Sequence, residues 1–215
     1  MRSLHILLLC AFPFIILAQV DPDAMKLLDE VAEKMINTEA WEIKFKYTLT
    51  NQKDNSSHEQ EGSIKLKGNK YILDMLGNTI YFDGEKNYNY IKEANEVMIM
   101  FPEEGTEELF FTKPSKLFTF HKEGYKSRLN DDIVMNKKKL HSVDLFPMDL
   151  EQSFFKINIL IKPEEKMVHS FKVFNKDGIQ YEIILNSIEA IEIPDVDFTF
   201  DPKKHPKVEI VDLTE

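Results

Sequence analysis

The chain has 215 residues, of which 43% are hydrophobic, 11% aromatic and 30% charged, a composition that can bury one substantial core and excludes a disordered, collagen-like or coiled-coil chain. Acidic residues outnumber basic ones by 37 to 27, and the resulting net charge of −10 disfavours nucleic acid as a partner because its phosphates would be repelled. A single cysteine excludes an internal disulfide and a cysteine-rich zinc site.

The N-terminus has the pattern of a secretory signal peptide. Arg2 precedes the apolar run Ile6–Leu17, and Ala18 supplies the small residue at which such peptides are cleaved. The run is too short for an uncleaved membrane anchor, and the residue before Cys10 is too large for a lipidated cysteine. The sequence therefore predicts an exported protein, with a signal peptide at 1–18 and a single domain at 19–215.

An amphipathic helix is predicted next. Asp21 is a good N-cap, and Pro22 suits the first helical position because its missing N–H is not needed there. The apolar residues then recur at helical spacing and predict one buried face: Leu28, Val31, Ala32, Met35 and Ile36. The pattern ends at Asn37-Thr38.

From Trp41 the apolar residues alternate, as in a long half-buried strand: Trp41, Ile43, Phe45, Tyr47 and Leu49. The polar stretch Asn51–Glu61 is predicted to be a loop. Further strands, separated by turn residues, are predicted at Ser63–Lys67, Lys70–Met75, Asn78–Phe82, Lys86–Ile91, Glu96–Phe101, Tyr125–Leu129, Lys139–Leu145, Phe154–Ile161, Val168–Phe174 and Ile179–Ser187. Leu117, Phe118 and Phe120 indicate a short helix. The expected fold is mainly β with α, having about eleven antiparallel strands in a sandwich or barrel.

The apolar composition permits two interpretations. The chain contains 16 Phe, 7 Tyr and 9 Met but only 1 Trp. Aromatic residues supply most of the burial in many well-filled β cores. The same residues also suit a curved sheet around a cavity, because flexible thioethers and flat rings accommodate variable hydrophobic ligands. Composition does not distinguish a filled core from a ligand cavity.

No catalytic motif is present. The histidines outside the signal peptide are scattered, without the spacing of a metal site: His58, His121, His141, His169 and His205. The acidic pairs lack the pattern of a calcium loop. There is no nucleophile elbow, Walker loop or dinucleotide-binding glycine motif. We therefore expect neither a metal nor a cofactor, and we expect a binding protein rather than an enzyme.

Several segments together carry a family resemblance. After the signal peptide, helix and long strand come Asn78-Thr79-Ile80-Tyr81-Phe82-Asp83-Gly84-Glu85-Lys86, Asp144-Leu145-Phe146-Pro147 with Phe155-Lys156-Ile157, and the run from Ile193 to Pro202 (IPDVDFTFDP). In this order the chain resembles the periplasmic outer-membrane lipoprotein carriers, the LolA-like family. The resemblance implies an incomplete β-barrel closed by helices over a hydrophobic cavity for the acyl chains of lipoproteins. It also implies a cleaved signal peptide, a periplasmic location and an inner-membrane ABC exporter as cargo donor, and it leaves an outer-membrane acceptor open. We expect a monomer.

The resemblance also suggests which residues form the cavity and its lid. The expected lining is Trp41, Ile43, Phe45, Tyr47, Leu49, Ile64, Leu66, Tyr71, Leu73 and Met75. The expected lid comprises Leu28, Val31, Ala32, Met35, Ile36, Leu117, Phe118 and Phe120. Better-known members carry an arginine after the second strand that ties the barrel to its lid, whereas Gly68 stands at the matching position here. Lys67 and Lys70 are the nearest cations, but they lack the planar fork of arginine.

The sequence is compatible with two other functions. The same half-barrel occurs in periplasmic sensors of lipids or lipoproteins, usually with an additional domain, for which the residues after the IPDVDFTFDP run leave little room. An enzyme acting on a hydrophobic substrate would need an acid, base or nucleophile constellation that the sequence does not display.

Overall fold

The computed structural model describes residues 21–102, 118–122 and 124–214. The predicted signal peptide, Leu117 and the side chain of Phe120 lie outside this described part. The helix is α1 (Pro22–Ile36), and the strands are β1 (Ala40–Asn51), β2 (Ser56–Lys67), β3 (Lys70–Met75), β4 (Asn78–Phe82), β5 (Asn87–Ile91), β6 (Glu96–Met100), β7 (Tyr125–Met135), β8 (Lys138–Pro147), β9 (Phe154–Lys162), β10 (Met167–Asn175), β11 (Ile179–Ala190) and β12 (Glu209–Asp212). Short 3-10 turns lie at Phe120–Lys122, Asp195–Phe198 and Pro202–Lys204.

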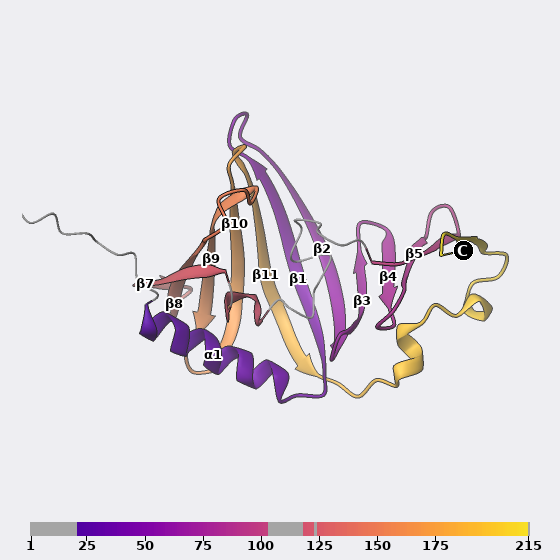
Figure 1. Cartoon of the computed structure of the whole chain (residues 1–215), viewed down its shortest axis with the longest axis horizontal. Coiled ribbons are helices and arrows are strands. Elements are labelled where there is room, and N and C mark those ends of the chain that lie inside the picture. Colours follow the sequence, from indigo (N-terminus) through magenta and orange to yellow (C-terminus); the bar gives the residue numbers. More distant parts are fainter. Residues whose placement is uncertain (1–20, 103–117, 123, 215) are drawn as a thin grey trace, which may run out of the picture.

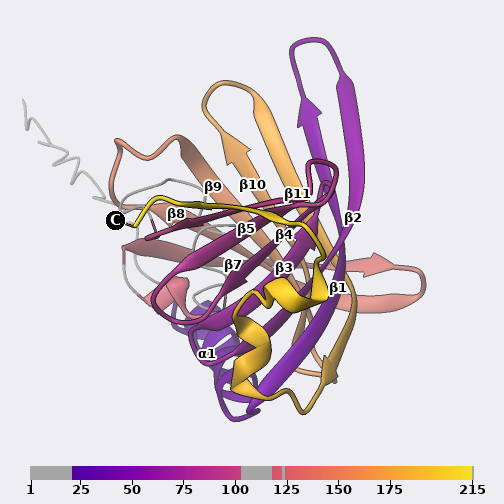
Figure 2. The same ribbon diagram turned by 90° about the vertical axis from the view of Figure 1, so that its right-hand side faces the viewer.

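The strands form one curved, open sheet (Figures 1 and 2). Their order is β12-β6-β5-β4-β3-β2-β1-β11-β10-β9-β8-β7, so β12 and β7 are the two edges and the sheet does not close. Neighbouring strands are antiparallel except β12, which runs parallel to β6. The predicted fold, an incomplete antiparallel barrel with a helix over it, is confirmed.

Several element boundaries differ from the prediction. The sheet has a twelfth strand, β12, which the sequence analysis did not predict. The predicted loop at Asn51–Glu61 is wrong in its second half, because Ser56–Glu61 continues β2 and pairs with the end of β1. The predicted short helix is a 3-10 turn at Phe120–Lys122, later than expected.

The helix begins where its capping residue predicts and is anchored to the edge strand. One Asp21 carboxylate oxygen accepts from the backbone N–H groups of Asp23 at 3.0 Å and Ala24 at 3.3 Å. The other accepts from the N–H of Leu129 in β7 at 3.0 Å. Leu28, Val31, Ala32 and Met35 are buried as predicted, whereas the predicted fifth member of this face, Ile36, is 62% exposed at the end of the helix. In Figure 1, α1 lies across the lower ends of the strands in the β7–β11 half.

Two apolar clusters lie on opposite faces of the sheet. The larger cluster fills the concave face and joins α1 to residues of β1, β2, β3 and β8 to β11. The smaller cluster, Tyr90, Val97 and Phe200, lies on the other face, where the C-terminal segment packs against β5 and β6. Within the described ranges, no helix has the length and apolar character needed to cross a membrane.

Candidate ligand-binding site

The ten predicted lining residues lie together on the concave face. Eight are buried, and Leu49 and Met75 are half-buried against the same cluster. Their side chains meet across neighbouring strands because the registers align them. Ile43 of β1 lies opposite Ile64 of β2, which lies opposite Leu73 of β3. Alternation along these strands therefore produces one continuous apolar wall, with Lys44 and its polar neighbours on the opposite face.

Phe45 occupies a special place in this wall. It lies opposite Gly62 of β2, and a Cβ atom built on Gly62 would come within 2.6 Å of the Phe45 ring. The β1–β11 register shifts between Lys44 and Phe45, which marks a bulge at this point. The absence of a side chain at Gly62 thus lets the ring lie against the floor of the sheet.

Two segments lie over the concave face on the side of β7 to β11. The helix contributes its buried face, and Phe118 packs against Phe171 of β10 with ring centroids 6.1 Å apart. His121 Nε2 lies 3.3 Å from a carboxylate oxygen of Asp29, so the turn Phe120–Lys122 is linked to the helix. Among the predicted lid residues, α1 and Phe118 therefore meet over the same apolar face.

Polar contacts hold the far end of the helix to the barrel. The indole N–H of Trp41 donates to the backbone carbonyl of Met35 at 2.9 Å, which satisfies an acceptor in the last helical turn. Lys34 donates to the carbonyl of Glu165 in the β9–β10 turn at 2.7 Å, and Lys166 pairs with Glu30 at 3.1 Å. Exposed ion pairs of this kind contribute little, about 0–1 kcal/mol each, so the helix is held firmly by its apolar face and only loosely by its charges.

A cleft of about 150 Å³ opens between the end of α1 and the barrel. Its apolar lining comprises Met35, Ile36, Trp41, Leu66 and Phe118. Ligand pockets usually measure about 300–1,000 Å³, so this cleft is too small for a whole acyl chain. Entry of such a chain here requires α1 or the residues around Phe118 to move away from the wall.

Gly68, in the turn between β2 and β3, borders this cleft. Gly68 has φ +59, and a Cβ atom there would meet no other atom within 4 Å. The neighbouring lysines connect to other partners. Lys67 pairs with Glu39, just after α1, at 3.0 Å and with Asp195 at 2.9 Å, while Lys70 pairs with Asp195 at 2.7 Å. The β2–β3 turn is thus tied to the C-terminal segment and to the connection between helix and sheet.

Burial favours the neutral forms of two titratable side chains here, Tyr71 in the wall and His121 beside α1. Burial raises the pKa of Tyr71 to about 12, and its hydroxyl donates to the side chain of Asn87 at 3.1 Å. Burial also lowers the pKa of His121, although its contact with Asp29 acts in the opposite direction. Both groups are therefore uncharged near neutral pH, as an apolar ligand requires.

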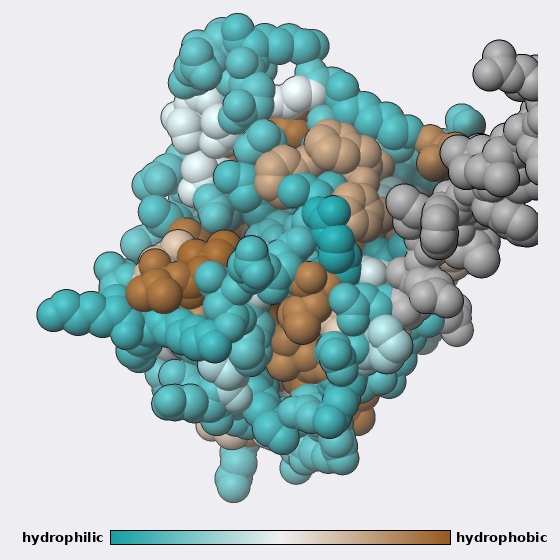
Figure 3. All heavy atoms as spheres, turned by 90° about the vertical axis from the view of Figure 1, so that its left-hand side faces the viewer, coloured by the Kyte–Doolittle hydropathy of each residue, from teal (hydrophilic) through white to brown (hydrophobic). Residues whose placement is uncertain are grey.

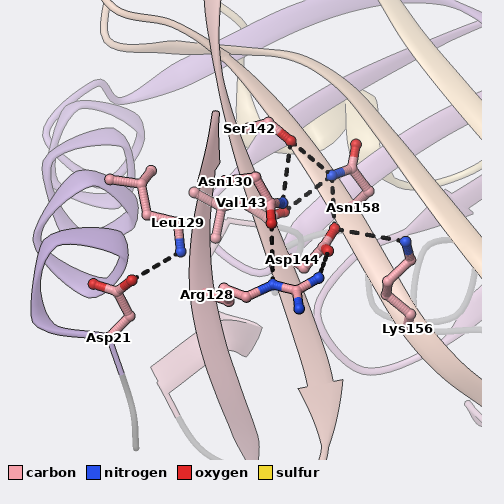
Figure 4. Close-up of polar contacts among 9 residues, drawn as sticks. All are labelled: Asp21, Arg128, Leu129, Asn130, Ser142, Val143, Asp144, Lys156 and Asn158. Atoms are coloured by element: carbon pink, nitrogen blue, oxygen red, sulfur yellow. Dashed lines mark hydrogen bonds and ion pairs between the residues drawn. The ribbon is translucent and has the colours of Figure 1, made fainter. Parts of the chain in front are cut away.

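A buried polar network, which no sequence pattern indicates, lies on the other face of β7, β8 and β9 (Figure 4). Asp144 accepts from Arg128 at 2.7 Å and from Asn158 at 2.8 Å. Asn158 also donates to Ser142 at 3.0 Å, and Asn130 donates to the same hydroxyl at 3.4 Å. Burial by itself raises the pKa of Asp144, but these hydrogen bonds keep it below its usual value. The network joins β7, β8 and β9 on the face opposite the concave cluster.

A second, larger cleft of about 760 Å³ lies on the outer face, beneath the C-terminal segment. Its lining includes charged groups of both signs, and these pair with one another: Lys65 with Glu42 at 3.7 Å and Lys204 with Asp197 at 3.7 Å. Because its walls are polar and charged, this cleft does not suit hydrocarbon. Across the described ranges, no group of three His, Cys, Asp or Glu side chains is placed to hold a metal ion.

Comparisons with known proteins agree with this architecture. A family model described as outer membrane lipoprotein carrier protein LolA matches residues 14–146, more than half of the chain. No curated protein matches at the sequence level.

Solved structures of low sequence identity are similar to this chain. An uncharacterized conserved protein from Thermus thermophilus is 12% identical, with a TM-score of 0.58 over 88% of this chain and 99% of its own. LprF from Mycobacterium bovis is 11% identical, with a TM-score of 0.51 over 82% of this chain and 98% of its own. A LolA superfamily protein from Nitrosomonas europaea is 11% identical, with a TM-score of 0.44 over 83% and 98%. The chain is a member of the LolA family of outer membrane lipoprotein carriers.

Proposed function

We propose that the protein is a periplasmic carrier that holds the acyl chains of lipoproteins against the concave apolar wall and moves them from the inner to the outer membrane. The observation that carries this proposal is the concave apolar cluster, which joins the continuous face of β1, β2 and β3 to α1 and Phe118, in a chain of the lipoprotein-carrier family. An inner-membrane ABC exporter supplies the cargo, and the carrier works as a monomer, without a cofactor and without catalysis.

The energetics of such a carrier fit the way the wall is covered. Burying one acyl chain of about sixteen carbons gains on the order of 12 kcal/mol before the costs of ordering and of opening the cavity. A carrier without its own ATPase must release this cargo. The helix and Phe118 occupy the apolar face when no cargo is bound, so they compete with the acyl chains and lower the net affinity. The competing surface consists of Leu28, Val31, Met35 and Phe118.

The test compares two adjacent positions of β1 that face opposite sides of the sheet. A photo-crosslinking residue replaces Phe45, which is buried in the wall, or Lys44, which is exposed on the other face. Both variants are produced in cells that contain the exporter and its lipoproteins. We expect lipoprotein adducts at position 45 and few at position 44.

Folding is measured separately by circular dichroism and thermal unfolding. A folded variant with the probe at position 45 that forms no lipoprotein adduct would show that this face is ordinary core. Adducts with free lipid alone, or with a membrane-bound regulator, would instead indicate a sensor. Phe45→Glu provides a second measurement, because an unpaired buried carboxylate should abolish capture of lipoproteins.

A further inference from the structure

The β7–β8 hairpin projects beyond the rest of the sheet at one side of the molecule (Figure 2). Its turn is Asn136-Lys137, with φ angles of 51° and 64° that are typical of a tight hairpin turn. Beyond the bulge that follows Asn130, only three residue pairs join the two strands, ending at Met135 and Lys138. The tip is therefore a narrow two-stranded ribbon.

This tip exposes apolar side chains on both faces of the ribbon. Ile133 is 38% exposed, Val134 73% and Met135 41%. Successive side chains of a strand point to opposite faces, so Val134 lies on one face and its two neighbours lie on the other. Figure 3, which shows the side of the molecule where β7 and β8 lie, has hydrophobic atoms gathered beside projecting hydrophilic side chains at one edge. Exposing three consecutive apolar side chains to water is unfavourable in free energy, and they gain no compensating burial in the core of this chain.

The same tip is basic, although the chain as a whole has a net charge of −10. Lys137, Lys138 and Lys139 follow one another, and all three are exposed. Asp132, at the bulge, is paired with Lys139 at 2.6 Å and with His141 at 2.6 Å, and Asp131 is the other acidic residue nearby. Within the part of the chain that the structure describes, neither Lys137 nor Lys138 pairs with a carboxylate.

We propose that this hairpin tip docks the protein on an anionic lipid surface, with Ile133, Val134 and Met135 entering the interfacial layer. Lys137 and Lys138 would meet the acidic headgroups. A bilayer interface surrounds an inserted ribbon and can cover both of its apolar faces, whereas the flat surface of a protein covers one. Clustered lysines beside exposed apolar side chains are the combination that binds anionic membranes.

The local structure disfavours pairing of β7 with a strand of another protein. β7 is an edge strand, but the bulge after Asn130 interrupts its hydrogen-bonding edge, and the N–H of Leu129 is already bonded to Asp21. Bulges, charges and covered N–H groups are the devices that block addition of another strand. The docking is separate from the acyl-chain site, because the hairpin tip does not belong to the concave cluster.

The experiment measures co-sedimentation of the purified protein with vesicles in the absence of lipoprotein. One set of vesicles contains equal parts of phosphatidylglycerol and phosphatidylcholine, and the other contains phosphatidylcholine alone. We expect binding to the anionic vesicles that weakens as salt is added. Each lysine near an anionic surface changes the partition by about five-fold, so Lys137→Gln combined with Lys138→Gln should lower it by about 25-fold at low salt.

Matched substitutions elsewhere serve as controls. Lys53→Gln combined with Lys203→Gln removes the same charge from exposed positions distant in the sequence and should leave the partition nearly unchanged. Val134→Ser should weaken binding several-fold, whereas Val196→Ser, at a valine that is also 73% exposed, should not. The proposal is overturned if the wild-type protein does not bind anionic vesicles, or if the hairpin and control lysine substitutions lower the partition equally. It is also overturned if the hairpin binds a protein but does not bind vesicles.

Discussion

Gly62→Ala tests whether the position of the Phe45 ring is set by the absence of a side chain on the neighbouring strand. The new Cβ atom would lie 2.6 Å from Cζ and 2.8 Å from Cε2 of Phe45, and 3.1 Å from the backbone oxygen of Asp74. Contacts this short force the ring to move, and Phe45 is only 5% exposed within the packed concave cluster. The ring must therefore shift toward the space that an acyl chain would occupy.

The expected cost is the difference between two opposing effects. Overpacking a core costs about 1–3 kcal/mol, while replacing glycine by alanine gains about 0.4–1 kcal/mol by restricting the unfolded chain. We therefore expect Gly62→Ala to lower the free energy of unfolding by roughly 1–2 kcal/mol. Urea denaturation measures this change, and Ser63→Ala, on the opposite face of the same strand, is the control with little expected effect.

A double-mutant cycle decides whether the loss arises from the ring. If the clash is with Phe45, combining Gly62→Ala with Phe45→Leu should cost less than the sum of the single substitutions by about 0.5 kcal/mol or more. Additive effects, or a Gly62→Ala protein as stable as the wild type, would refute the reasoning. In a carrier, Gly62→Ala should also weaken acyl-chain binding, because the displaced ring occupies the same space.

Polar contacts give three further predictions. Asp144→Ala removes the buried acceptor of the strand network and should lower the free energy of unfolding by about 1–3 kcal/mol in urea, whereas Glu59→Ala, which breaks an exposed ion pair, should cost less than about 1 kcal/mol. Because burial lowers the pKa of His121, the unfolded chain binds the proton more readily, and stability should fall as the pH drops below about 6.5, the unfolded value. His121→Gln should flatten this part of the stability-versus-pH curve, and an unchanged slope would exclude the residue as its source. Trp41→Phe removes the donor to the Met35 carbonyl and should speed hydrogen exchange in the last turn of the helix, with no change there contradicting an anchoring role.

Local sequence patterns predict those elements in which buried side chains recur at the regular spacing of a helix or a strand. The helix has a capping aspartate and an apolar stripe, and β1 alternates from Trp41 to Leu49, so both were found. Ser56–Glu61 is a strand without this pattern. It extends β2 because β1 continues beyond the core and supplies a hydrogen-bonding partner for a polar segment. A strand stabilised by its neighbour rather than by burial leaves no periodic signal in the sequence.

The features that sequence reasoning missed depend on contacts between distant residues. β12 has four residues and pairs with β6, more than a hundred residues earlier in the chain. Asp144 meets Arg128 and Asn158 only because three strands align them. The exposed position of Ile36, at the end of a stripe that otherwise faces the core, depends on where the chain turns away into β1. These arrangements follow from the register of the sheet and not from any single segment.

The central position of β1 has a consequence for how the chain acquires its structure. β1 lies between β2, which follows it directly, and β11, which begins at Ile179. One side of the first strand therefore has no partner until most of the chain has been synthesised. Pairings of such large sequence separation slow folding, and until they form, the apolar wall is available to other chains as a site of aggregation. The strand that contributes most to the proposed binding surface is thus also the last to gain its second partner. We therefore expect newly synthesised chains to depend on a holding factor until β11 is available.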